Sequence, residues 1–174
     1  MFRKRRNSAG IGASHAAATE VCMHRAAPIV LFSLLTLVTG CSGTRPTTLG
    51  VQAGALSPCP PSPNCVSSSA TDEEHGIAPL SYDGHERAEV RELLLAILAE
   101  TSRVNIVVSD ADYIHAEFTT LIWRFVDDVE FYLPEGEVVV HVRSASRLGE
   151  SDLGKNRERI EELRAAFDSR LSTP

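Results

Sequence analysis

The residues best suited to bind a ligand lie close together, between Arg143 and Arg157. This stretch leaves a predicted strand, passes a glycine-containing turn and opens a predicted helix, where unpaired backbone N–H groups and the positive end of the helix dipole favour anions. Arginine side chains add planar donors that suit carboxylate or phosphate. We therefore expect a candidate site for a small anionic ligand, made of Arg143, Ser144, Ser146, Arg147, Asn156 and Arg157.

A structural explanation of the same residues stays open. The arginines can pair with Asp127, Asp128 or Glu130 on the preceding predicted strand, and Ser151 or Asp152 can cap the helix. Asn156 shares a predicted helical stripe with Leu153, Ile160 and Leu163, so its amide must hydrogen-bond to loop backbone or to a ligand.

A second group of polar residues would suit an enzyme. His115 and Glu117 alternate on one predicted strand, and His141 lies on another. Such side chains can bind a metal or transfer protons, but mixed charges are also normal on a solvated sheet face. The chain has no nucleophile elbow around its serines, no phosphate loop and no dinucleotide fingerprint. We expect no cofactor and no metal, and an envelope enzyme with this polar face is the alternative to a non-enzymatic binding or accessory module.

A cysteine that closes an apolar run indicates export and lipidation. Residues 26–38 are apolar, follow a basic start and end at Leu37-Val38-Thr39-Gly40-Cys41. The run is too short to span a bilayer of about 30 Å, and its layout is that of a cleaved secretory signal. Its end resembles the lipobox of a bacterial lipoprotein signal, which implies cleavage before Cys41 and acylation of the Cys41 sulfur. An ordinary core segment with a cysteine is the alternative.

The expected organisation follows from this signal. Residues 1–40 are the signal peptide, with a true start at Met23 or else a long basic leader, and residues 41–58 carry the lipidated cysteine and a flexible tether. Residues 59–174 form a single globular domain. Ser42 after the cysteine resembles lipoproteins that reach the outer membrane, so we expect a lipid-anchored protein on the periplasmic face of that membrane.

Charge narrows the set of partners. Of 17 Lys and Arg residues five precede Cys41, whereas only one of 23 Asp and Glu residues does. The part after residue 40 therefore has a net charge near −10, which is repelled by nucleic acid and by anionic headgroups. We expect membrane contact through acyl chains on Cys41, no nucleic acid, and an envelope protein as a further candidate partner.

Cys59 and Cys65 lie six residues apart around three prolines. In an oxidising compartment two such cysteines can close a small disulfide loop. Free thiols are the alternative, and a metal site would need two more soft ligands nearby.

Apolar periodicity predicts an α+β fold. Helices are expected over residues 86–100 and 152–171, and strands over 104–109, 113–119, 124–133 and 137–143. We expect a four-stranded antiparallel sheet with two helices packed on one face. Strand alternation puts Phe125, Val129, Phe131 and Val138 toward the helices and His115, Glu117, Glu130 and Arg143 on the opposite side. Asp127 falls on the apolar side, so it needs a bulge or a buried partner.

Several blocks of sequence resemble a known family. They cover residues 59–68, 77–80, 113–118, 125–131 and 143–157, with Ser62-Pro63-Asn64-Cys65 and Arg143-Ser144-Ala145-Ser146-Arg147-Leu148-Gly149 among them. With these blocks the chain is similar to the domain of unknown function 1499 family, found in bacterial envelope proteins and plastid relatives. The resemblance implies one domain in an extracytoplasmic setting, and it supplies no established activity.

Overall fold

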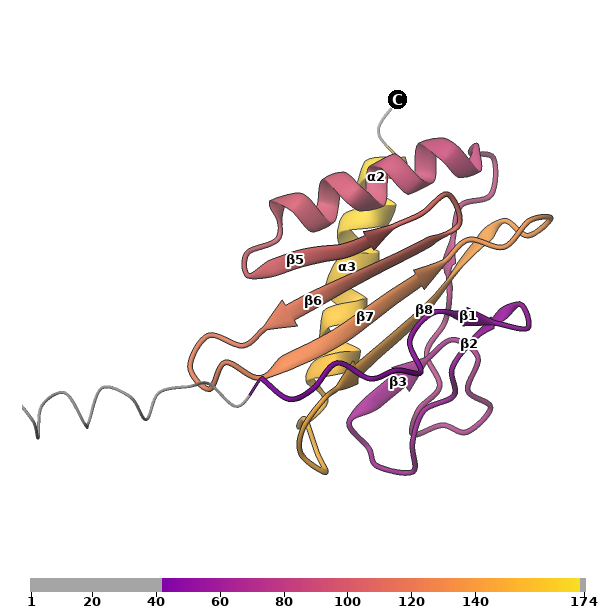
Figure 1. The fold of residues 1–174 in the computed structure, drawn as a ribbon. Helices are drawn as coiled ribbons and strands as arrows, with labels where there is room; N and C mark the ends of the chain where they lie inside the picture. Colours follow the sequence, from indigo (N-terminus) through magenta and orange to yellow (C-terminus); the bar gives the residue numbers. More distant parts are fainter. Residues whose placement is uncertain (1–41, 173–174) are drawn as a thin grey trace, which may run out of the picture. The chain divides into compact units, whose positions relative to one another are not determined.

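The computed structural model describes residues 42–172, so the predicted signal sequence and Cys41 lie outside the described part. Its main sheet has six antiparallel strands in the order β3-β8-β7-β6-β5, with β4 also paired to β8 (Figure 1). The strands are β3 (Cys65–Ser67), β4 (Leu80–Ser81), β5 (Val104–Ser109), β6 (Tyr113–Thr119), β7 (Val126–Tyr132) and β8 (Val139–Ser146). The expected four-stranded sheet is therefore wrong.

The two added strands come from the stretch before the first helix. β3 and β4 have only three and two residues, too few for an alternating pattern to stand out. β8 extends to Ser146 because Cys65, Val66 and Ser67 pair with its second half, opposite Ala145, Ser144 and Arg143. Long-range pairing thus created strands that local periodicity did not predict.

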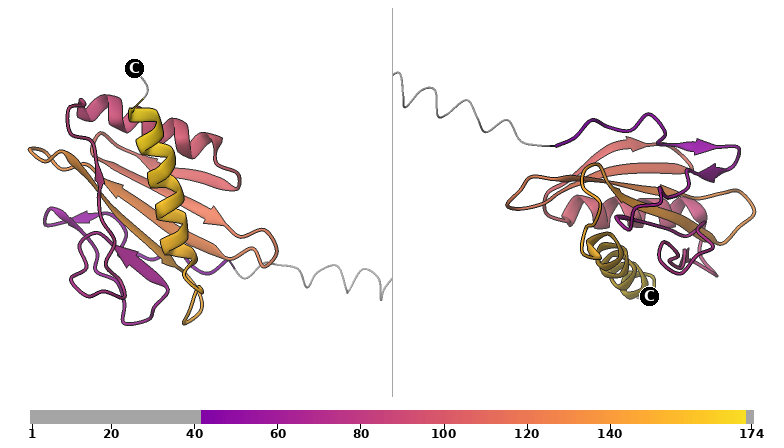
Figure 2. Two further views of the ribbon diagram at one scale, coloured as in Figure 1. Left: turned by 180° about the vertical axis from the view of Figure 1, so that it is seen from behind. Right: turned by 90° about the horizontal axis from the view of Figure 1, so that it is seen from below.

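Two helices, α2 (Arg87–Glu100) and α3 (Lys155–Leu171), cover one face of the sheet (Figure 2). They bury apolar stripes against the sheet residues Ile114, Val129 and Phe131, each of which is fully buried. α3 starts at Lys155, so Leu153, expected on its buried stripe, is 91% exposed. Phe125 and Val138 lie just outside their strands and are also exposed. The buried helical residues are Val90, Leu94, Ile97, Leu98, Ile160, Leu163 and Phe167.

The opposite face of the sheet is covered by residues 42–58, which we call the strap. The strap contains β1 (Val51–Gln52) and β2 (Ala55–Leu56), which pair as a two-stranded antiparallel sheet (Figures 1 and 2). Leu56 is 4% exposed, and Gly50 and Arg45 bond to side chains of the main sheet. Residues expected to be a free tether therefore pack on the domain. No helix within residues 42–172 has the length and apolar character needed to cross a bilayer.

Candidate functional site

The strap side of the sheet carries a buried cluster of charges centred on Arg147. Arg147 Nε and Nη2 donate to the two carboxylate oxygens of Asp128 at 2.8 and 2.7 Å, and Nη2 also donates to Glu117 at 2.5 Å. His115 Nε2 donates to Asp128 at 2.8 Å, and Arg45 of the strap donates to Glu117 at 2.6 Å. Strand pairing makes this cluster, because β6 sets Glu117 opposite Asp128 on β7. Two carboxylates thus meet two guanidinium groups.

A second ion pair lies beside the first on the same face. Glu130 is fully buried, and its Oε1 accepts from the Tyr113 hydroxyl and from the Gly50 backbone N–H of the strap, both at 2.8 Å. Its Oε2 accepts from Arg143 at 3.0 Å, across the β7–β8 ladder. Arg143 Nε is the single buried side-chain nitrogen or oxygen without a partner among residues 42–172. The strap therefore supplies one of the three hydrogen bonds that satisfy Glu130.

These contacts shift the protonation of the carboxylates. Burial raises the pKa of Asp128, but the hydrogen bonds from Arg147 and His115 together outweigh it and hold that pKa below its usual value. Burial likewise raises the pKa of Glu117, and Arg147 and Arg45 reverse the effect, so its pKa is also lowered. Burial, and next the negative charge of Glu130, raise the pKa of Tyr113. Both acids therefore stay ionised, and Tyr113 stays a hydrogen-bond donor.

The helix side of the sheet holds a separate polar cluster. Asp127 points toward α3 without a bulge in β7, and Arg159 of α3 donates to it at 2.5 Å. The same guanidinium stacks 5.0 Å from the centre of the Phe118 ring. Arg159 is thus the buried partner that the position of Asp127 required.

Asn156 lies at the centre of that helix-side cluster and is fully buried. Its amide nitrogen donates to the Asn64 carbonyl at 2.8 Å and to Ser146 at 3.0 Å, and its oxygen accepts from Ser144 at 2.6 Å. Arg159 also donates to that oxygen at 2.6 Å. Asn156 therefore joins α3 to β8 and to the residue before β3, and its hydrogen-bonding capacity is used within the protein.

The start of α3 also has internal partners. The Asp152 carboxylate accepts from the backbone N–H of Gly154 at 3.0 Å and of Asn156 at 2.6 Å, which occupies the place an anion would take. Arg157 donates to the carbonyls of Gly76 and Glu74 at 2.7 and 2.9 Å. Its role is to hold the 73–76 loop on α3.

The structure does not bring the predicted anion-site residues together. Arg143 and Arg147 lie on the strap side of the sheet, whereas Ser144, Ser146 and Asn156 lie on the helix side, because alternate residues of a strand face opposite ways. The polar trio is also divided. His115 pairs in register with Glu130, while His141 lies across β7 opposite Tyr132 and hydrogen-bonds Ser68 at 3.1 Å.

Residues 55–167 match the family described as a protein of unknown function, DUF1499. This chain belongs to the DUF1499 family. No curated protein matches the chain. The matched region of this DUF1499 protein covers β2 through most of α3, and it includes the helix-side cluster and all of the strap-side charges except Arg45.

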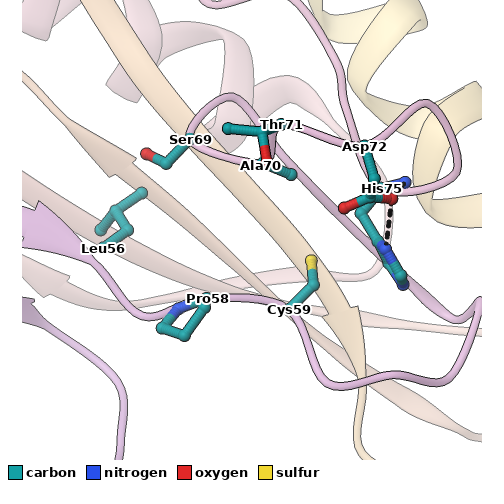
Figure 3. Close-up of a pocket in the computed structure, with 8 residues that line it drawn as sticks. All are labelled: Leu56, Pro58, Cys59, Ser69, Ala70, Thr71, Asp72 and His75. Atoms are coloured by element: carbon teal, nitrogen blue, oxygen red, sulfur yellow. Dashed lines mark hydrogen bonds and ion pairs between the residues drawn. The ribbon is translucent and has the colours of Figure 1, made fainter.

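The cysteine loop of this DUF1499 domain contains the disulfide expected from the sequence, between Cys59 and Cys65. Beside it is a shallow pocket of about 250 Å³, lined on one side by Leu56 and Pro58 and on the other by residues 69–72 (Figure 3). This volume is below the range of about 300–1,000 Å³ typical of small-molecule sites. Sequence reasoning missed the Asp72–His75 pair at the pocket edge, although three-residue spacing of Asp and His is a recognisable turn signal.

The Asp72–His75 pair stabilises a turn of the chain. The His75 backbone and Nδ1 both contact Asp72 Oδ1, at 2.9 and 2.7 Å. The side-chain hydrogen bond to Asp72 raises the pKa of His75. Within the described residues there is no group of three or more His, Cys, Asp or Glu side chains able to hold a metal ion.

Proposed function

We propose that this chain is a lipid-anchored protein of the bacterial cell envelope, held by acyl chains on Cys41, and that its DUF1499 domain is a non-enzymatic binding or accessory module. The anchor rests on the apolar run that ends at Leu37-Val38-Thr39-Gly40-Cys41. The periplasmic face of the outer membrane is the location we propose, because Ser42 follows the cysteine.

The observation that carries the non-enzymatic proposal is the internal pairing of the polar candidates. On the strap side, three carboxylates, Glu117, Asp128 and Glu130, meet three guanidinium groups, those of Arg45, Arg143 and Arg147. Catalytic acids and bases need a free position for substrate and a pKa near the working pH. Here the strap covers the acids and the arginines keep the pKa of both Glu117 and Asp128 low. This internal pairing supports a stabilised scaffold, and an envelope protein is the partner that we propose for it.

The anchor is tested by exchanging single cysteines. In Cys41→Ser we expect no acylated product in intact-mass measurements and loss of the mature protein from the membrane fraction. Cys22→Ser is the matched control, since Cys22 precedes the apolar run, and it should be acylated normally. A cleaved Cys41→Ser protein that still fractionates with membranes would contradict the lipoprotein proposal.

The module proposal has its own test. Purified protein should contain no stoichiometric zinc, and cross-linking in cells followed by detergent extraction should recover a defined envelope protein with it. Stoichiometric metal that is lost in His115→Ala would instead favour the enzyme alternative.

A further inference from the structure

Large apolar side chains are exposed almost entirely at one end of the sheet. Seven are at least 40% exposed among the described residues, and all but Val138 lie in the loop after β6 (residues 120–125) or the loop after β8 (residues 147–154). We call these two loops the apolar end. Its members are Leu121, Ile122, Trp123, Phe125, Leu148 and Leu153, with Leu121, Ile122 and Trp123 each 69–77% exposed. An apolar group concentrated this way marks a binding surface.

Hydrogen bonds hold the loops of the apolar end in a defined conformation. Backbone Thr120 N donates to Phe125 O at 2.9 Å, and Phe125 N donates back to the Thr120 hydroxyl at 2.9 Å. These two bonds close the base of the loop, so Leu121, Ile122 and Trp123 project from it. The second loop lies beside the first, because Arg147 N donates to Val126 O at 3.2 Å.

The chain enters the domain at this same end. A Cβ placed on Gly43 would lie 2.9 Å from Arg147 Cβ and 3.1 Å from Leu148 Cγ. In Figure 1 the first described residues accordingly run beside the loop that joins β6 to β7. Cys41 is two residues before Gly43, and two residues span at most about 7 Å. An acyl chain on Cys41 therefore has to enter the bilayer close to the apolar end.

We propose that the apolar end inserts Leu121, Ile122 and Trp123 into the outer part of the bilayer that holds the acyl chains of Cys41. The proposal rests on the lipid anchor proposed above. Because the strap packs on the sheet and is not a free tether, the anchor holds this end of the domain at the membrane surface. Tryptophan favours the boundary between headgroups and acyl chains, and the exposed Trp123 in the loop after β6 is placed to reach that boundary.

Charge favours uncharged lipid headgroups over an anionic surface. Within the apolar end Arg124 and Arg147 balance Glu150 and Asp152, and Arg147 is already paired with Asp128. Insertion is thus driven by burial of apolar surface and is insensitive to ionic strength.

Trp123 is the one tryptophan of the chain, so its fluorescence reports on this loop alone. The experiment uses the full chain, expressed so that it is acylated and reconstituted in phosphatidylcholine vesicles with and without brominated acyl chains. We expect emission shifted to shorter wavelength than in a soluble Cys41→Ser protein, and at least a twofold loss of intensity with brominated lipid. Salt at 0.5 M, which shortens the Debye length from about 8 Å to about 4 Å, should leave both the emission shift and the quenching unchanged. 

Two variants separate insertion from anchoring. Leu121→Ser with Ile122→Ser should stay acylated and vesicle-bound, keep the melting temperature of the wild type, and lose most of the quenching. Val138→Ser, at the 50% exposed apolar position outside the apolar end, should quench like the wild type. The proposal is overturned if the wild type is acylated and vesicle-bound but Trp123 emits as in water. It is also overturned if Trp123 is shielded from water and is not quenched by brominated lipid, a result that points to a protein partner. Absence of acylation overturns the anchor instead.

Discussion

Removal of Arg147 tests whether the strap-side charges are a structural network. The Arg147 and Asp128 side chains are 7% and 1% exposed, and Arg147 makes three hydrogen bonds to Asp128 and Glu117. Removing one member of such a buried pair leaves an uncompensated charge and typically costs about 3–5 kcal/mol. We expect Arg147→Ala to lower the free energy of unfolding at pH 7 by about that amount.

The pH dependence of this loss has a definite sign. The pKa values of Asp128 and Glu117 are lowered from their ordinary 3.8 and 4.5. The two ionised carboxylates therefore stabilise the wild type at pH values above these, and their contribution is lost as the pH falls. Without Arg147, burial remains as the largest influence on Asp128, and it raises the pKa. The difference between wild type and variant should therefore be largest near pH 7 and shrink toward pH 4.

The assay is urea unfolding monitored by far-ultraviolet circular dichroism at pH 7, 5.5 and 4. Arg170→Ala is the matched control, because Arg170 pairs with Glu100 at exposed positions, and such pairs contribute about 0–1 kcal/mol. A loss below about 1 kcal/mol for Arg147→Ala, or a loss equal at all three pH values, would refute the buried network.

The same variant tests the anion site predicted from the sequence. With its donors used by Asp128 and Glu117, Arg147 should give no phosphate-specific stabilisation over chloride at matched ionic strength. A phosphate-dependent rise in melting temperature that is present in wild type and absent from Arg147→Ala would restore the ligand site.

Further predictions concern the cysteine loop before β3 and the start of α3. The protein purified without reductant should be two hydrogens lighter than its dithiol form. Replacing both cysteines, Cys59→Ala with Cys65→Ala, should lower the free energy of unfolding by about 2 kcal/mol, because the short loop is no longer closed in the unfolded chain. Full alkylation of Cys59 and Cys65 in the native protein would contradict the disulfide. Asn156→Ala removes the acceptor of the Ser144 hydroxyl, the donor to the Ser146 hydroxyl and one of the two hydrogen bonds to the Asn64 carbonyl, at about 1–3 kcal/mol for a buried unsatisfied group, so the melting temperature should fall by several degrees. Leu153→Ala, at a 91% exposed position, should leave the melting temperature unchanged.

The local sequence pattern was enough to predict the strands and helices that are long enough to repeat their alternating or helical spacing. Alternation over residues 113–119 predicted β6 with the bounds it has, and helical spacing of Val90, Leu94 and Leu98 predicted α2. Alternation also placed His115 and Glu117 on the face opposite the helices. It failed for β3 and β4, which have too few residues to repeat, and for the start of α3, where Leu153 fits the helical spacing but has a positive φ of 56°.

The sequence by itself determined the apolar run before Cys41, the paired cysteines, the family blocks and the direction that each strand residue faces, because each depends on neighbours a few positions apart. Only the tertiary structure decided what those faces contact. Arg45, Glu117, Asp128 and Arg147 come from the strap, two strands and the loop after β8, and Arg159 reaches Asp127 from α3. Ion-pair partners so distant in sequence are chosen by strand register and helix packing, which pair Arg143 and Arg147 of the predicted anion site with Glu130 and Asp128.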